Sequence, residues 1–148
     1  MATPILNTIT ASIVTTLEAV TTGGGYNVTL TVEKLHEDRN IQNQLGDNKA
    51  VVVLNSLTPS DTRPLGHDEW IANYTVYVGV YTSEASETVI SDQMAVVGCD
   101  VNKALAVDLT RGGYAVNTII DGIEAGETAI LINFHVLYRT LEGNPFAQ

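Results

Sequence analysis

The longest alternating segment of the chain runs from residue 128 to residue 141 and predicts a central β-strand. Every second residue from Ile130 to Tyr138 is apolar, and this period of two is typical of a strand with one face in the core. The opposite face mixes leucines with Asn133, His135 and Arg139. Because that face is half polar, we expect it to be only partly covered, either by another element or by a partner chain.

Four further segments have the patterns of strands: residues 26–32, 49–55, 69–81 and 114–123. The segment 69–81 has an apolar face similar in length to that of 128–141, so we expect these two strands to lie near each other in one sheet. Residues 121–127, with the sequence DGIEAGE, predict the acidic tip of a hairpin that leads into the final strand. Residues 33–48 and 57–68 predict exposed connections, because they are polar or rich in Pro and Gly.

Two segments have the period of an amphipathic helix. The first begins at Thr3, a residue type that caps free amide groups, and Pro4, which is tolerated at the first helical position. Its apolar stripe consists of Ile5, Ile9, Ile13, Leu17 and Val20. The stripe of the second helix consists of Ile90, Met94, Val97, Val101, Leu105 and Leu109. Within the second helix Gly98 predicts the close approach of another backbone, and Arg111 complements the dipole at its carboxyl end.

The order helix, three strands, helix, two strands predicts an α+β fold. We expect a mostly antiparallel sheet of about five strands with the two main helices packed on one face. A chain of 148 residues suits a single domain spanning residues 1–148.

The chain is strongly acidic, with 17 acidic and 7 basic residues and a formal charge of −10. No window clusters Lys or Arg, so sequence-specific DNA binding is not expected. The single cysteine, Cys99, excludes an internal disulfide and a multi-cysteine zinc site, fits a reducing cytoplasm, and is expected to be a buried, inert thiol. Polar residues interrupt every apolar run, so we expect neither a signal peptide nor a membrane span.

No nucleotide-binding, nucleophile-elbow or metalloprotease motif occurs in the sequence. Two triplets come closest to a catalytic cluster: residues 36–38, with the sequence His-Glu-Asp, and residues 67–69, with the sequence His-Asp-Glu. Consecutive residues point in different directions, and neither triplet has a second ligand at strand or helix spacing, so both are interpreted as solvated loop residues. We therefore expect no catalytic residue, no metal ligand and no cofactor. His135 is interpreted as a hydrogen-bonded structural histidine. Core packing is the expected role of five aromatic residues: Trp70, Tyr74, Tyr77, Tyr81 and Tyr138.

Two stretches in the last third of the chain carry a resemblance to a known family. Residues 104–118 read ALAVDLTRGGYAVNT and residues 132–145 read INFHVLYRTLEGNP. A helix ending in D-L-T-R-G-G, a strand with A-V-N-T and a final V-x-Y-R-T-L-E with N-P resemble the small tail terminator, or tail completion, proteins of tailed bacteriophages. The first helix, with Asn7-Thr8-Ile9, is similar to a lesser degree, and residues 33–68 show no similarity.

The resemblance implies a structural virion protein of the tail and neck, assembled in the host cytoplasm. In that family an α+β subunit forms a ring, commonly a hexamer, at the head-proximal end of the tail tube. The ring ends tube polymerisation and joins the tail to the head. The implied partners are further copies of the chain, the tail tube protein and a head-completion or connector protein, with DNA passing through as a non-specific cargo.

A ring needs a pair of unlike, complementary surfaces on each subunit. We expect part of the contact with the neighbouring subunit or the tube to come from six residues: Arg39, Asn40, Gln42, Asn133, His135 and Arg139. Six copies would carry a formal charge of −60, since each carries −10. An acidic lumen would repel passing DNA, and three residues are candidates for its wall: Asp121, Glu124 and Glu127. The alternative is that these carboxylates only solvate a hairpin tip.

Other functions remain compatible with the sequence. A head-completion adaptor or a tail-tube subunit would have a similar composition and a similar α+β fold. A small metal-dependent hydrolase would use His36 or His67 with nearby carboxylates. A generic cytosolic binding module is the third alternative.

Overall fold

The computed structural model describes residues 2–34, 48–62, 64–80, 87–126 and 129–148. These residues form a five-stranded sheet in the order β1-β2-β3-β5-β4. The strands are β1 (Thr31–Lys34), β2 (Lys49–Pro59), β3 (His67–Gly79), β4 (Asn117–Ala125) and β5 (Ala129–Leu141). The pair β1–β2 is parallel and the other three pairs are antiparallel.

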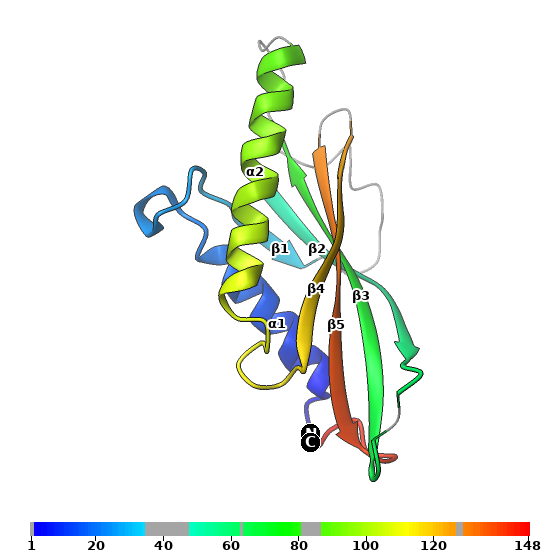
Figure 1. The fold of residues 1–148 in the computed structure, drawn as a ribbon. Helices are drawn as coiled ribbons and strands as arrows, with labels where there is room; N and C mark the ends of the chain where they lie inside the picture. The colour runs from blue at the N-terminus through cyan, green and yellow to red at the C-terminus, as the bar shows by residue number, and fades with distance from the viewer. Residues whose placement is uncertain (1, 35–47, 63, 81–86, 127–128) are drawn as a thin grey trace.

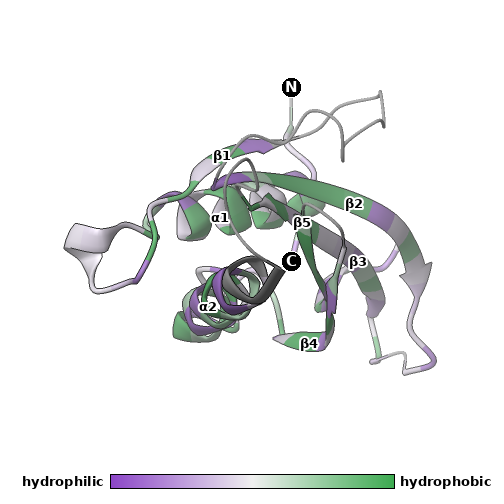
Figure 2. Cartoon of the chain, turned by 90° about the horizontal axis from the view of Figure 1, so that it is seen from above, coloured by the Kyte–Doolittle hydropathy of each residue, from purple (hydrophilic) through white to green (hydrophobic). Residues whose placement is uncertain are grey.

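Two α-helices, α1 (Ile5–Glu18) and α2 (Glu87–Val107), pack on one face of this sheet (Figure 1). Seen from above, the sheet curves around both helices (Figure 2). The core between the layers contains Ile9 and Ile13 of α1, Val101 of α2, and Ile132 and Phe134 of β5. The predicted α+β fold, with a mostly antiparallel sheet and two helices on one face, is therefore confirmed.

Strands β3 and β5 form the centre of the sheet. They pair antiparallel along their whole length, from His67 opposite Leu141 to Gly79 opposite Ala129, which confirms the expected proximity of these two segments. On the helix side, the rings of Tyr74 and Phe134 stack with centroids 5.4 Å apart.

The aromatic residues divide between the two faces of the sheet. Tyr74 and Tyr138 are buried in the core and Trp70 packs against it, as predicted. Tyr77 is half-buried and points to the other face, since its neighbours in β3 point inward. Tyr81 lies outside the described residues.

The strand expected at residues 26–32 is wrong in most of its length, since β1 contains only Thr31–Lys34. The backbone N–H groups of Asn27 and Val28 instead donate to the carboxylate of Asp100 in α2, at 2.7 and 3.0 Å. A helix side chain, and not a neighbouring strand, therefore satisfies this part of the backbone.

The connection expected at residues 57–68 is shorter than predicted, because β2 extends to Pro59 and β3 begins at His67. All residues of β2 from Leu54 to Pro59 are exposed. Apolar and polar residues alternate along a strand when one of its faces is buried. A strand that is exposed on both faces therefore has no alternating pattern by which the sequence could predict it. A register irregularity between Leu54 and Ser56 also interrupts the period.

Residues 121–125, which include the acidic Asp121 and Glu124, belong to β4, whereas the sequence predicted them at the tip of the hairpin. The register between β4 and β5 shifts between Ile120 and Gly122, so Asp121 is an extra residue that lengthens the strand. The strand continues to Ala125, and the N–H of Gly126 donates to the carbonyl of Ala129 at 2.8 Å.

The sequence predicted that Thr3 caps the start of α1, and this prediction is wrong. Pro4 is the N-cap residue, and no side chain caps the helix. The N–H of Ile5 donates to the carbonyl oxygen of Pro145 at 3.1 Å. The C-terminal segment therefore holds the first turn of α1, so residues 5 and 145 lie side by side. Figure 1 shows the C-terminal segment beside the start of α1.

Gly98 allows close packing of α2, but against side chains and not against another backbone as predicted. A Cβ atom at Gly98 would lie 2.9 Å from Cδ1 of Ile130 and 3.4 Å from Cγ2 of Ile123. The missing side chain thus lets α2 lie close to β4 and β5.

Candidate functional site

The sheet face opposite the helices is the main candidate surface, and we call it the uncovered face. Its centre consists of directly paired residues of β3 and β5: Glu69 with Arg139, Ile71 with Leu137, Asn73 with His135, Thr75 with Asn133, and Tyr77 with Leu131. Three of these rows are polar and two are apolar. The structure therefore places Asn133, His135 and Arg139 on one face, as the sequence predicted.

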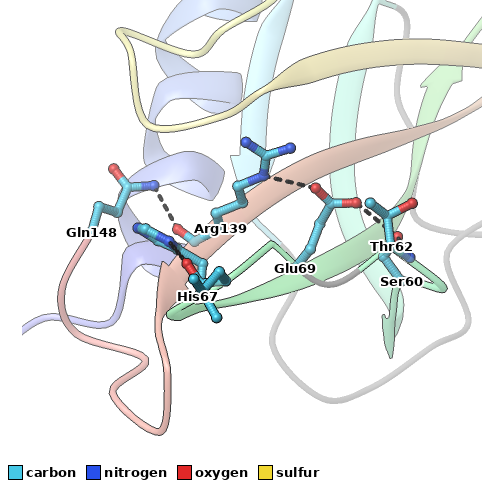
Figure 3. Close-up of polar contacts among 7 residues, drawn as sticks. Ser60, Thr62, His67, Glu69, Arg139 and Gln148 are labelled. Carbon is cyan, nitrogen blue, oxygen red and sulfur yellow. Dashed lines mark hydrogen bonds and ion pairs between the residues drawn. The ribbon is translucent and has the colours of Figure 1, made fainter.

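The row nearest the start of β3 is a charged network. The Nε atom of Arg139 donates to Oε2 of Glu69 at 2.8 Å, and the hydroxyl of Ser60 donates to Oε1 at 2.8 Å (Figure 3). The hydrogen bond from Arg139 holds the pKa of Glu69 below its ordinary value, against an opposing effect of burial. This carboxylate is therefore charged and already paired at neutral pH.

The middle rows form a chain of amide and hydroxyl groups across three strands. Nδ2 of Asn55 in β2 donates to the hydroxyl of Thr75 at 2.6 Å, and this hydroxyl donates to Oδ1 of Asn133 at 2.7 Å. Nδ2 of Asn73 donates to the hydroxyl of Ser56 at 3.0 Å. These contacts fix the side chains in place, so the face presents a preorganised pattern of polar groups.

His135 is bound to an acidic residue of the neighbouring strand. Its Nδ1 lies 2.8 and 2.9 Å from the two carboxylate oxygens of Asp121. The hydrogen bond expected for His135 is therefore present. It also places Asp121, a candidate for the lumen wall, on the same face as the candidate contact residues.

The remaining predicted site residues fall into two groups. Glu124 is exposed in β4, opposite Leu131 of the uncovered face. Four of the predicted residues lie outside the described part of the chain: Arg39, Asn40, Gln42 and Glu127.

The described His-containing triplet, residues 67–69, does not form a shared site. His67 has its Nδ1 3.2 Å from the carbonyl oxygen of Leu65, Asp68 accepts from the N–H of Gly143 at 2.9 Å, and Glu69 is bound to Arg139. The triplet that begins at His36 lies outside the described residues. Across the described ranges, no group of three or more His, Cys, Asp and Glu residues could hold a metal ion.

A pocket of about 390 Å³ lies between the two helices. It is lined by Ser12, Thr15, Thr16, Ala19, Tyr26, Ala104 and Val107. Its hydroxyl groups can form hydrogen bonds, and the lining residues include no carboxylate, imidazole, amine or thiol.

Arg111 has a larger role than the one predicted for it at the end of α2, because it is fully buried. Its Nη2 donates to the carbonyl of Leu105 in the last turn of α2 at 2.6 Å, which extends its predicted role at this helix end. Its Nη1 donates to the hydroxyl of Thr16 in α1 at 3.3 Å, while Nε has no hydrogen-bond partner. Burial lowers the pKa of the Arg111 guanidinium, and the charge of Asp108 opposes this shift. The residue joins the two helices.

Two aspartates near α2 are also structural. Buried Asp100 accepts from the segment at Asn27 and Val28. Asp108 accepts from the N–H groups of Thr110 and Gly112, at 3.0 and 2.7 Å. The hydrogen bond from Gly112 is the main reason why the pKa of Asp108 lies below its ordinary value.

Cys99 contradicts its prediction, since it is exposed and not buried. Gly98 faces the sheet, and Asp100 binds the segment at Asn27. Because both neighbours of Cys99 face inward, Cys99 lies on the solvent side of α2.

The fold and this surface define an α+β protein with a preorganised, partly apolar sheet face that no described helix covers. No protein-family model matches the chain, and no curated protein matches it. Within the described residues, none of the helices has the length and apolar character needed to cross a membrane.

Proposed function

We propose that this chain is a structural subunit of a bacteriophage tail that forms a closed ring at the head-proximal end of the tail tube. The ring, expected to be a hexamer, ends tube polymerisation and joins the tail to the head connector while DNA passes through. The proposal starts from the resemblance of residues 104–118 and 132–145. The uncovered face is the structural observation that carries it.

The composition of the uncovered face suits a contact between proteins. The apolar pairs Ile71–Leu137 and Tyr77–Leu131 lie among three polar rows. A partner can bury the apolar pairs while it forms hydrogen bonds with the polar rows. The polar groups already have fixed positions, so little side-chain entropy is lost when the partner binds.

The charge of the uncovered face also favours contact in an acidic ring. Each subunit carries −10, so identical subunits repel each other. In the centre of this face the carboxylate of Glu69 is balanced by Arg139. Glu124 and Asp121, which is bound to His135, lie at the β4 margin of the same face, where their charges would face an acidic lumen.

The first experiment measures the mass of the purified protein by light scattering at several concentrations, with negative-stain images of any large species. Closed rings of fixed copy number are expected. Open tubes would identify a tube subunit instead. A strict monomer that also fails to bind purified tail tubes would leave a binding module, and a stoichiometric metal in elemental analysis would indicate the hydrolase alternative.

Two variants test the contribution of the uncovered face. Leu137→Asp puts a carboxylate into an apolar row and is expected to abolish rings. Ala11→Asp adds the same charge at an exposed position of α1 and should leave rings intact. Equal assembly of both variants contradicts a role for the uncovered face.

Deletion within residues 33–48 tests the second predicted part of the contact. Loss of Arg39, Asn40 and Gln42 is expected to abolish rings while the subunit stays folded, as monitored by circular dichroism. Intact rings from the deletion variant contradict their assignment to the contact.

A further inference from the structure

The sheet has two edges, and the edge at β4 is open along a long strand. Among the described strands, β4 pairs only with β5 and β1 pairs only with β2. The nine residues of β4 therefore present one edge of backbone N–H and C=O groups without a strand partner. Such an edge is a template for pairing with another chain.

The β4 edge also has exposed apolar side chains on both faces of the sheet. Ile119, 38% exposed, lies opposite His135 on the uncovered face. Ile123, 45% exposed, points to the helix side, where it contacts the position of Gly98 in α2. An added strand would cover apolar surface on both faces while it completes the backbone hydrogen bonds, which are the two contributions to β-strand addition.

Features that protect an open edge are scarce in β4. Its sequence, NTIIDGIEA, contains neither Lys nor Pro, the residues with which proteins commonly block edge pairing. The irregularity at Asp121 and the charges of Asp121 and Glu124 are the features of this strand that oppose edge pairing.

We propose that β4 of one subunit pairs antiparallel with β1 of a second copy of this chain. This inference rests on the proposed ring for the identity of the occupant. The pairing joins two different edges, as a cyclic assembly requires. If a rotation about an axis along the strands relates the subunits, β4 of one and β1 of the next run in opposite directions, because three antiparallel pairings and one parallel pairing separate them in the sheet.

The charges at the two edges are complementary. Strand β4 contains the acidic residues Asp121 and Glu124 and no basic residue. At the other edge, β1 contains Lys34, and Lys49 of β2 lies 3.1 Å from Glu33. The sequence of β1 together with the adjoining Lys49 therefore contains two basic residues and one acidic residue, within a chain of formal charge −10. A second copy can thus approach β4 through its least acidic edge.

The test is chemical cross-linking between two single-cysteine variants, in a background with Cys99→Ser because Cys99 is exposed. Thr31→Cys marks the β1 edge and Ile119→Cys marks the β4 edge. Mixed in equal amounts and treated with a short bismaleimide, they are expected to give a dimer that contains one chain of each kind. Each variant alone should give none, and a chain with both cysteines should give a ladder that ends at the ring copy number.

Leu57→Cys is the matched control, because Leu57 is 39% exposed against 38% for Ile119 but lies in β2. Its mixture with Thr31→Cys is expected to give at least ~10-fold less cross-linked dimer, which corresponds to about 1.4 kcal/mol in relative population.

Three results would overturn the inference. If Ile119→Cys cross-links to itself, two copies meet through the same edge. If none of the mixtures cross-links in protein that light scattering shows to be oligomeric, the edge pairing is wrong while the ring proposal survives. If the chain stays monomeric even with purified tail tubes, both fail.

Discussion

Replacing Arg111 tests whether one buried cation holds the two helices together. The side chain is fully buried and binds the carbonyl of Leu105 in α2 and the hydroxyl of Thr16 in α1. Arg111→Ala removes both contacts and leaves a cavity between the helices. Because Arg111 has a φ of 50°, any substitution other than glycine keeps the same backbone strain, so this strain cancels in the comparison.

The expected loss follows from opposing contributions. A hydrogen bond from a charged donor contributes ~1.5–3 kcal/mol, a cation at a helix carboxyl end up to ~2 kcal/mol, and a large-to-small core change costs ~2–5 kcal/mol. Removal also relieves the desolvation of the guanidinium, a cost of several kcal/mol. We expect Arg111→Ala to lower the free energy of unfolding by about 3 kcal/mol. Arg111→Met, which fills most of the volume, should lose less, at ~1–2 kcal/mol.

The assay is urea unfolding followed by circular dichroism. With a slope of ~1–3 kcal/mol per molar urea, a loss of ~3 kcal/mol moves the midpoint by ~1–3 M, and the melting temperature should fall by ~6–12 °C. The control is Lys103→Met, which removes an exposed cation that contacts the carbonyl of Gly25 and the ring of Tyr26 and should cost less than ~1 kcal/mol. An Arg111→Ala variant as stable as the original chain would refute the reasoning.

Three further changes test other contacts. Hydrogen bonding from Gly112 lowers the pKa of Asp108 below its ordinary value of 3.8, so the stabilising effect of this carboxylate is complete above pH 3.8 and is lost as the pH falls through the lower folded-state pKa. The difference in the free energy of unfolding between Asp108→Asn and the original chain should therefore be smaller at pH 3 than at pH 6. Tyr74→Phe removes a buried 2.7 Å hydrogen bond to Thr10 and should lower the free energy of unfolding in urea by ~1–2 kcal/mol. Because burial raises the pKa of Tyr74 to about 12, the stability difference between Tyr74→Phe and the original chain should shrink above pH 10. A difference that stays constant with pH would contradict this. Gly98→Leu should lower the free energy of unfolding by ~1–3 kcal/mol through overpacking against β5. Gly98→Ala should change it by no more than ~1 kcal/mol, since the helix propensity gained offsets a small shift of the neighbouring side chain. Equal melting temperatures for the two variants would contradict the close packing of α2.

The sequence predicted the sheet and helices where burial alternates along the chain. Strand β5 and both helices have one buried face, so their periods are visible in the apolar residues. Residues 26–30 have the same alternation in burial, with Tyr26 and Val28 half-buried and Leu30 buried. They form no strand, because Asp100 binds the backbone there. Alternation thus reports burial, and only the tertiary partners decide whether a strand forms.

The candidate site was predicted in part for a similar reason. Asn133, His135 and Arg139 share a face because they are two or four residues apart in one strand. Their partners Thr75 and Asp121 depend on the register between strands, which the sequence does not specify by spacing. The irregularity at Asp121 shifts that register by one residue and turned a predicted hairpin tip into part of the uncovered face.

The D-L-T-R-G-G segment, residues 108–113, has a structural explanation in this fold. Asp108 accepts from the N–H of Gly112, and Arg111 returns to the end of α2. Arg111, Gly112 and Gly113 have φ values of 50, 72 and 89°, a left-handed run that glycine adopts without strain. Each part of this segment therefore serves to end α2 and direct the chain into β4. Since β4 is both the margin of the uncovered face and the open edge of the sheet, the same segment determines where the two proposed contact surfaces lie.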